Sequence, residues 1–115
     1  MKKETIITIS IIVGIIILCI LVLLFKSFNN KPIGEEVVKC ISNKSILFIQ
    51  TGCSHCIKQE ELFGDKVELL NIVNCIKSPE ICSENNIIKI PTWIINNEKY
   101  VGFYKINELK EITDC

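Results

Sequence analysis

The chain has 115 residues, of which 49% are hydrophobic, and it carries 13 basic and 13 acidic side chains. This length leaves room for one folded domain. All the basic residues are lysines, and the region from Pro32 onward has nine lysines and twelve acidic residues, which excludes a basic nucleic-acid-binding surface and any site built on the bidentate guanidinium of arginine.

The first distinct segment is an uncharged run at residues 6–25, dominated by Ile, Leu and Val. A helix of this length is about 30 Å long, which matches the hydrocarbon core of a bilayer. A cleaved signal peptide has a shorter apolar region and small residues at its cleavage site, whereas this run ends in Leu24-Phe25-Lys26-Ser27-Phe28. We predict an uncleaved transmembrane anchor at 6–25 after a short N-terminal stub at 1–5, with Cys19 as an apolar filler.

A polar segment at residues 26–34 follows, and we interpret it as a linker. Lysines on both sides of the anchor compete in the positive-inside rule, so charge leaves the orientation open. Six cysteines occur from Pro32 onward, and disulfides persist in oxidising compartments outside the cytosol. We therefore expect a single-pass membrane protein whose folded domain, residues 35–115, lies on the extracytoplasmic side.

Within the domain, apolar periodicity and turn residues predict alternating helices and strands. The expected helices are 35–43, 57–63, 79–85 and 106–112, and the expected strands are 46–49, 67–73, 92–95 and 99–103. Asn96-Asn97 is a turn signal between the last two strands. This order predicts an α/β fold in which helices cover both faces of a mixed sheet. So small a core gains from disulfides, by about 2 to 4 kcal/mol each.

The candidate reactive residues form a CxxC motif, Cys53-Ser54-His55-Cys56, between a predicted strand and a predicted helix. Two intervening residues bring the sulfur atoms within bonding reach, and the unpaired amides of a helix N-terminus favour a thiolate on the first cysteine. We predict that Cys53 is the nucleophile and that Cys56 resolves the mixed disulfide.

The two residues inside the motif are candidates for tuning it. His55 is the single histidine of the chain, and its positive charge would lower the pKa of Cys53, although it could equally be a solvated turn residue. Ser54 could donate a hydrogen bond to sulfur or act as an ordinary helix cap.

The same motif also occurs in zinc ribbons, which require a second ligand pair. Cys75 and Cys82 are separated by six residues rather than two to four, and no second histidine exists. We therefore predict no metal and no organic cofactor.

A second motif is Ile90-Pro91-Thr92, at the start of the strand predicted at 92–95. Together with the strand at 46–49 and the CxxC motif, it makes the chain from Ile46 onward resemble the thioredoxin superfamily. The resemblance implies a thioredoxin-like three-layer fold with a mixed central sheet. It also implies that Pro91 is cis, that Ile90, Pro91 and Thr92 form a substrate groove, and that the backbone of Ile90 pairs with an extended substrate segment.

Within that superfamily, the chain is most similar to thioredoxin-like domains associated with bacterial and archaeal homologues of vitamin K epoxide reductase. The shared features are Gln59, Glu61-Leu62-Phe63-Gly64, Asn74-Cys75, Cys82, Pro91-Thr92-Trp93, Asn97, Tyr100 and Gly102. The resemblance implies a structural disulfide between Cys75 and Cys82. It also implies a membrane redox partner, resembling such a homologue, that reoxidises Cys53 and Cys56 with a quinone.

The sequence departs from ordinary thioredoxins at two positions: Leu47 replaces a buried acidic residue, and Gly52 replaces a tryptophan. Both departures argue against a cytosolic reductase. Cys40 and Cys115 have no place in the pattern; each could be a free thiol, or they could pair with one another or across chains.

We therefore expect a membrane-anchored thiol-disulfide oxidoreductase that introduces or exchanges disulfides in exported proteins, with thiol-containing or disulfide-containing proteins as its substrates. One alternative is a membrane-tethered disulfide reductase, for example in cytochrome maturation. The other is a non-catalytic binding module that presents Trp93 and the Pro91 groove to a membrane partner.

Overall fold

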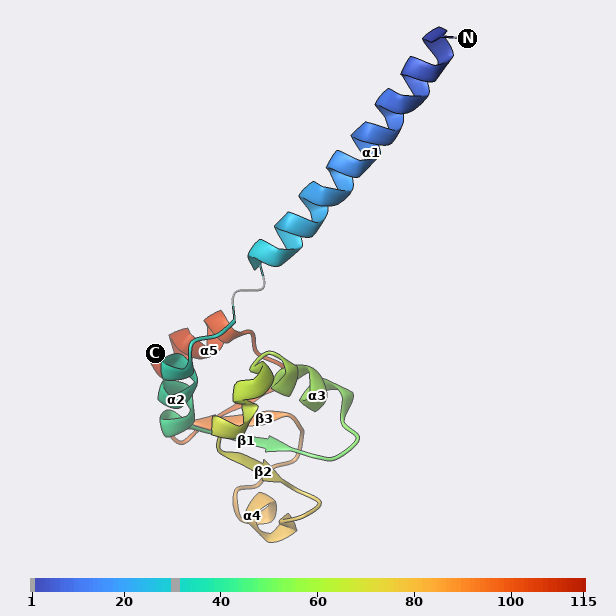
Figure 1. Cartoon of the computed structure of the whole chain (residues 1–115). Coiled ribbons are helices and arrows are strands. Elements are labelled where there is room, and N and C mark those ends of the chain that lie inside the picture. The colour runs from blue at the N-terminus through green and yellow to red at the C-terminus, as the bar shows by residue number, and fades with distance from the viewer. Residues whose placement is uncertain (1, 30–31) are drawn as a thin grey trace. The chain divides into compact units, whose positions relative to one another are not determined.

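The computed structural model describes residues 2–29 and 32–115, and the chain divides into an N-terminal unit and a folded domain, Pro32–Cys115 (Figure 1). The N-terminal unit consists of helix α1, Lys2–Asn29, which is long and apolar enough to cross a membrane. It extends beyond the predicted span at both ends. Glu4 in its first turn and Lys26 in its last turn favour this extension, because each charge opposes the helix dipole.

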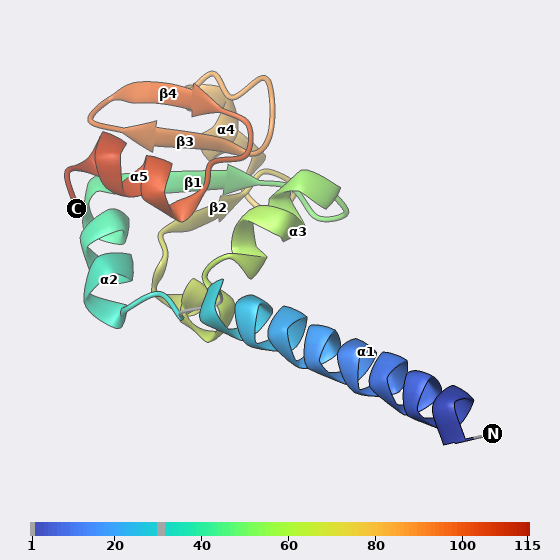
Figure 2. The ribbon, with the colours of Figure 1, turned by 90° about the horizontal axis from the view of Figure 1, so that it is seen from above.

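The domain is built on a four-stranded sheet in the order β2-β1-β3-β4 (Figure 2). The strands are β1 Ser45–Ile49, β2 Ile72–Asn74, β3 Thr92–Ile95 and β4 Glu98–Val101. β1 runs parallel to β2 and antiparallel to β3, and β3 runs antiparallel to β4. The parallel pair is joined by a helical crossover and the antiparallel pair by a tight turn, as these geometries require.

Helical segments lie on both sides of this sheet (Figures 1 and 2). Their bounds are α2 Glu35–Lys44, α3 Ser54–Glu61, the 3-10 helix η1 Gly64–Leu69, α4 Pro79–Glu84 and α5 Ile106–Thr113. The segments α2, α3, η1 and α5 lie on one face, and the short α4 lies on the other. The prediction of a thioredoxin-like α/β fold with a mixed sheet is therefore confirmed: a parallel β1-α3-β2 unit is followed by a β-hairpin and a final helix.

The main core lies between the sheet and the larger helical layer. Alternate residues of β1 and β3 point into it, since side chains alternate across a strand, and Leu47 lies opposite Trp93 in the register. The buried members of this core are Val38, Ile41, Leu47, Ile49, Cys56, Phe63, Leu70, Trp93, Ile95 and Leu109. The ring centroids of Phe63 and Trp93 are 6.1 Å apart. This contact packs the segment that follows α3 against the centre of the sheet.

Two predicted elements differ from the structure by more than two residues at one end. The prediction of a strand over 67–73 was wrong, because residues up to Leu69 form η1 and the strand covers only Ile72–Asn74. A short apolar run does not distinguish a strand from a tight helix, and here the amides of Lys66 and Leu70 bond to carbonyls three residues back. The predicted helix at 57–63 instead covers Ser54–Glu61.

The predicted turn at Asn96-Asn97 is confirmed. Both residues have positive φ, 52° and 66°, as two-residue hairpin turns of the primed type require.

A disulfide between Cys40 and Cys115 joins α2 to the C-terminal end of the domain. The pairing of these cysteines, which the sequence left open, is therefore with one another. Beside it, the Lys44 ammonium donates hydrogen bonds to the carbonyls of Thr113 and Asp114, at 2.8 and 3.1 Å. Carbonyls at a helix C-terminus lack partners within the helix, so Lys44 caps α5 while the disulfide fixes the chain end.

We predict that replacing Cys40→Ser together with Cys115→Ser lowers the free energy of unfolding by about 4 kcal/mol. The disulfide closes a loop with a sequence separation of 75, and loss of so long a crosslink enlarges the unfolded ensemble. Urea unfolding of the full chain in detergent measures the change. Cys19→Ser, which removes the free cysteine of α1, is the control, and an unchanged midpoint in the double variant would contradict the role.

Gln59 joins helix α3 to the loop between β4 and α5. Its side-chain amide donates to the carbonyl of Tyr104 at 2.9 Å, and its side-chain oxygen accepts from the amide of Tyr104 at 2.8 Å. Gln59 is fully buried. Because buried polar groups are costly when unpaired, this reciprocal pair fixes the rotation of α3.

We expect Gln59→Met to lower the free energy of unfolding by about 1 to 3 kcal/mol, since it keeps the side-chain volume but leaves the Tyr104 backbone groups without partners. Hydrogen exchange should show lost protection at the Tyr104 amide in particular. A variant with a lower unfolding midpoint but a fully protected Tyr104 amide would show that the bond pair is not the cause.

Candidate active site at the Cys53–Cys56 disulfide

The CxxC motif lies at the point where the chain leaves β1 and enters α3. Gly52, with a φ of +83°, turns the backbone through a conformation that other residues rarely adopt. Cys53 is the N-cap of α3, and its sulfur accepts a hydrogen bond of 3.2 Å from the amide of Cys56. Cys53 and Cys56 are joined by a disulfide, with their Cα atoms 5.2 Å apart.

The two sulfur atoms have different access to solvent. Cys53 is partly exposed, whereas Cys56 is 1% exposed and belongs to the core. An external thiolate can therefore reach Cys53 but not Cys56, because exchange requires direct attack on sulfur. The Cys53 sulfur caps the Cys56 amide, one of the helix-start amides that have no partner within the helix and that favour negative charge there.

The remaining residues of the motif, Ser54 and His55, are both exposed. The interpretation of Ser54 as the helix cap was wrong. Cys53 is the N-cap, because its sulfur accepts a hydrogen bond from the amide of Cys56. His55 lies in the first turn of α3, between the two cysteines in the sequence.

Residues that follow β2 hold the active-site loop in place. The Asn74 side-chain amide donates to the Thr51 hydroxyl at 2.9 Å, and the amide of Cys75 donates to the carbonyl of Ile49 at 2.9 Å. Cys75 is joined by a disulfide to Cys82 of α4. Cys75–Cys82 therefore fixes the segment that anchors the loop two residues before Cys53. Sequence reasoning missed this Asn74–Thr51 contact, because no local pattern pairs residues 23 apart.

The segment before β3 lies at the same end of the sheet. The Ile90–Pro91 peptide bond is cis, and Pro91 is buried while Ile90 is partly exposed. Register places this segment beside the motif, since Thr92 lies opposite Phe48 near the end of β1. The carbonyl of Pro91 accepts from the amide of Gly102 at 2.8 Å, and the Thr92 hydroxyl donates to the carbonyl of Lys89 at 2.5 Å.

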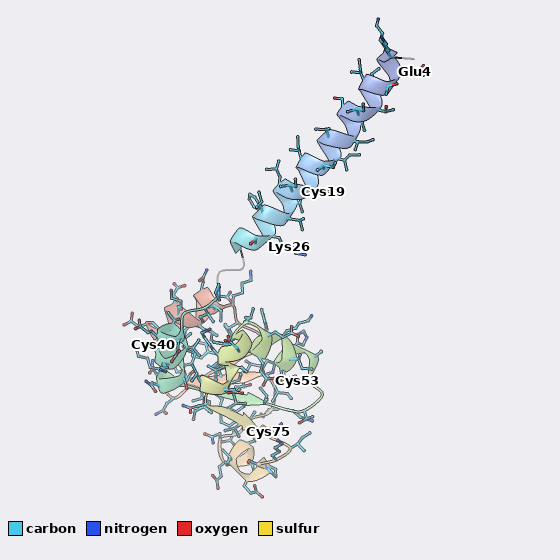
Figure 3. The ribbon with its side chains drawn as sticks, in the orientation of Figure 1. Glu4, Cys19, Lys26, Cys40, Cys53 and Cys75 are labelled. Atoms are coloured by element: carbon cyan, nitrogen blue, oxygen red, sulfur yellow. A yellow bond between two sulfur atoms is a disulfide. The ribbon has the colours of Figure 1, made fainter. Side chains whose placement is uncertain are left out.

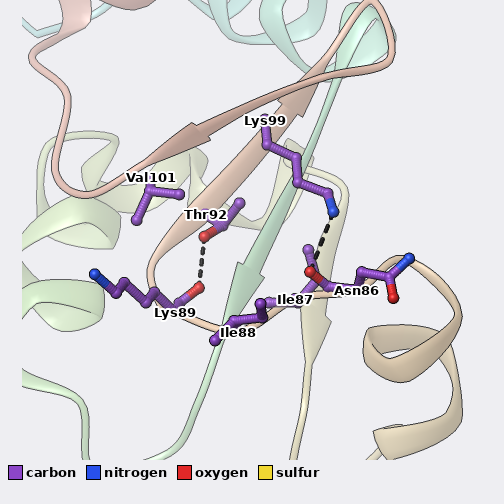
Figure 4. Close-up of a pocket in the computed structure, with 7 residues that line it drawn as sticks. All are labelled: Asn86, Ile87, Ile88, Lys89, Thr92, Lys99 and Val101. Carbon is purple, nitrogen blue, oxygen red and sulfur yellow. Dashed lines mark hydrogen bonds between the residues drawn. The ribbon is translucent and has the colours of Figure 1, made fainter.

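A pocket of about 370 Å³ lies beside this segment, bounded by the loop that precedes it and by β3 and β4 (Figure 4). Its lining residues are Asn86, Ile87, Ile88, Lys89, Thr92, Lys99 and Val101. The Lys99 ammonium donates to the carbonyl of Asn86 at 3.1 Å across one side of it.

The remaining features of the site concern the Glu60 carboxyl and metal binding. Partial burial raises the pKa of the Glu60 carboxyl, which lies one turn after Cys56 on α3. Within residues 2–29 and 32–115, no three His, Cys, Asp or Glu side chains are grouped so that they could hold a metal ion.

The three disulfides lie apart from one another in the domain. Figure 3 labels one cysteine of each pair, and Cys40, Cys53 and Cys75 lie in different parts of the domain. Cys53–Cys56 and Cys75–Cys82 each join a partly exposed cysteine to a buried one, but of the three pairs only Cys53–Cys56 includes the N-cap of a helix. Cys53–Cys56 is therefore the candidate exchange site.

No family model matches the chain. Among solved structures, the NTD_N/C domain of alkylhydroperoxide reductase AhpF from Enterococcus faecalis is similar with a TM-score of 0.46 and 17% identity, over 72% of this chain and 45% of that one. This likeness is too weak to add to the argument from topology.

Among curated proteins, the chain is similar to "Thiol-disulfide oxidoreductase LTO1" of Arabidopsis thaliana, with 37% identity over 70 residues. The match covers 53% of this chain but 19% of that relative, so the chain spans about a fifth of the relative's length. This similarity supports the resemblance to the thioredoxin superfamily.

Proposed function

We propose that this chain is a membrane-anchored thiol-disulfide oxidoreductase that passes the Cys53–Cys56 disulfide to proteins outside the cytosol. One observation carries the proposal: an accessible sulfur at the start of α3 is bonded to a buried sulfur one turn inside the helix. The similarity to a thiol-disulfide oxidoreductase adds support. The apolar helix α1 supplies the anchor, and the further disulfides Cys40–Cys115 and Cys75–Cys82 favour an oxidising compartment.

The exchange proceeds in two steps. A substrate thiolate attacks the exposed Cys53 sulfur, the Cys53–Cys56 bond breaks, and Cys56 leaves as a thiolate that takes up a proton. A second substrate thiolate then attacks the substrate sulfur of the mixed disulfide and releases Cys53 as a thiolate. Two electrons pass from the substrate dithiol to the protein, and the substrate gains a disulfide. The helix-start amide that bonds to the Cys53 sulfur stabilises the released thiolate.

Continuous turnover requires an oxidant that regenerates Cys53–Cys56. We place this role with a membrane redox partner resembling a vitamin K epoxide reductase homologue, which would hand the electrons to a quinone. In the reductase alternative, electrons pass from Cys53 and Cys56 to a substrate disulfide. The reduction potential of the Cys53–Cys56 pair distinguishes the two directions.

We predict a reduction potential of about −120 to −200 mV for Cys53–Cys56, the range of disulfide donors. His55→Ala should make it more negative by up to about 30 mV, equivalent to about 1.4 kcal/mol, because a positive charge beside the Cys53 thiolate favours the reduced form. Equilibration of the full chain with glutathione buffers, read by mass after alkylation, measures both values.

His55→Lys is the matched variant for this measurement, since it keeps a positive charge at the position and should retain most of the potential. A value near about −270 mV for the unaltered chain would instead indicate a reductant, and the donor role would be abandoned.

Substitution of each cysteine should separate the enzyme from a binding module. We expect Cys56→Ser to accumulate mixed disulfides between Cys53 and substrates, because the resolving thiol is gone, and Cys53→Ser to form none because the accessible sulfur is gone. Non-reducing electrophoresis of the membrane fraction after acid quenching measures this difference. Cys19→Ser should behave as the unaltered chain, and equal trapping by both active-site variants would contradict the assigned order of attack.

A further inference from the structure

The end of the sheet that carries the active site is basic, although the domain as a whole is acidic. Four segments meet there, as the strand register shows, and they are residues 50–58, 74–78, 86–92 and 101–105. These segments contain four lysines, Lys58, Lys77, Lys89 and Lys105, and no Asp or Glu. The rest of the domain has the other five lysines and all twelve acidic residues. Positive charge is therefore concentrated around Cys53.

These four lysines are free to meet a partner. All are exposed, and in the described part of the domain the ion pairs are Lys39–Glu35 and Lys66–Asp65, away from this end. The carboxylates nearest to them in sequence are Glu60 and Glu61, in the later part of α3, Glu80 in α4, and Glu108 in α5, which accepts a hydrogen bond of 2.6 Å from the backbone amide of Lys105. Where charges of one sign predominate around a site, they attract ligands of the opposite sign and speed their association.

Exposed apolar side chains occur in the same segments. Ile57 is 50% exposed, Ile76 57%, Ile88 91% and Phe103 39%. Ile88 and Lys89 both line the pocket beside the Pro91 segment, together with Lys99 and Val101 (Figure 4). Apolar groups left in water around a site mark a contact surface, and here they are interspersed with cations.

We propose that the substrates of this oxidoreductase are protein segments in which acidic and apolar side chains flank the cysteines, an inference that rests on the proposed function. The lysines around Cys53 attract the carboxylates of such a segment, and the exposed isoleucines and Phe103 contact its apolar residues. A segment with flanking lysines is repelled by the same surface. Charge complementarity of this kind acts mainly on the association rate and on the choice of partner.

The test uses the oxidised full-length chain in neutral detergent and three synthetic dithiol peptides. The peptides share their cysteines and apolar residues and differ only in whether the flanking positions are Glu, Ser or Lys. The rate of peptide disulfide formation is measured by acid quenching and mass spectrometry. At low salt we expect the Glu peptide to react about tenfold faster than the Lys peptide, and we expect this ratio to approach one at about 0.5 M salt.

Charge reversal supplies the matched variants. Lys77→Glu with Lys89→Glu should reverse the order of the peptides, and Lys77→Ser with Lys89→Ser should remove most of the preference. Lys39→Glu with Lys110→Glu, on α2 and α5, makes the same change in net charge at a distance from Cys53 and should keep the original order.

The outcomes separate this inference from the proposed function. Equal rates for the three peptides, or a reversed order in the Lys39 and Lys110 variant, would overturn the substrate preference and leave the oxidoreductase intact. Failure to oxidise any of the three peptides would overturn the proposed function, and the preference with it.

Discussion

The hydrogen bond from the Cys56 amide to the Cys53 sulfur is the constraint on which the site depends. A helix start must satisfy its free amides, and serine, threonine, aspartate or asparagine usually do so. Here a cysteine sulfur takes that position, so in the proposed function the group that caps the helix is also the group that reacts. When the disulfide opens, the thiolate at Cys53 remains where the helix-start amides favour negative charge. Capping and chemistry therefore require the same geometry, and any shift of α3 relative to β1 would weaken both.

The surrounding fold holds that geometry from three sides. The buried strand β1 delivers the chain to Gly52, the Asn74–Thr51 hydrogen bond steadies the loop, and Gln59 ties α3 to the segment before α5. Each of these hydrogen bonds joins α3, or the loop before it, to a part of the chain outside α3. A helix of eight residues has little stability of its own, so its position is set by these long-range bonds and by the packing of Phe63 on Trp93.

The sequence predicted the order of strands and helices and the CxxC helix, because each depends on local patterns: apolar periodicity, a glycine turn and an asparagine pair. It failed at 67–73, where apolar spacing suited both a strand and the 3-10 helix η1, which ends just before the buried Leu70. It also left Cys40 and Cys115 unassigned, since their pairing joins residues 75 apart and depends on how α2 packs against α5. The lysines around Cys53 were visible in the sequence, but their gathering at one end of the sheet follows from strand register and not from spacing along the chain.

The two bracing disulfides bear on how the third can function. A domain of this size buries a small core and is only marginally stable alone, so a redox cycle that opened its sole crosslink would also threaten the fold. Cys40–Cys115 secures the first helix of the domain to its last residue, and Cys75–Cys82 secures the segment that anchors the active-site loop. Cys82 is 5% exposed, which shields that sulfur from attacking thiols. Cys53–Cys56 can then open and close while the fold is held by crosslinks outside the exchange site.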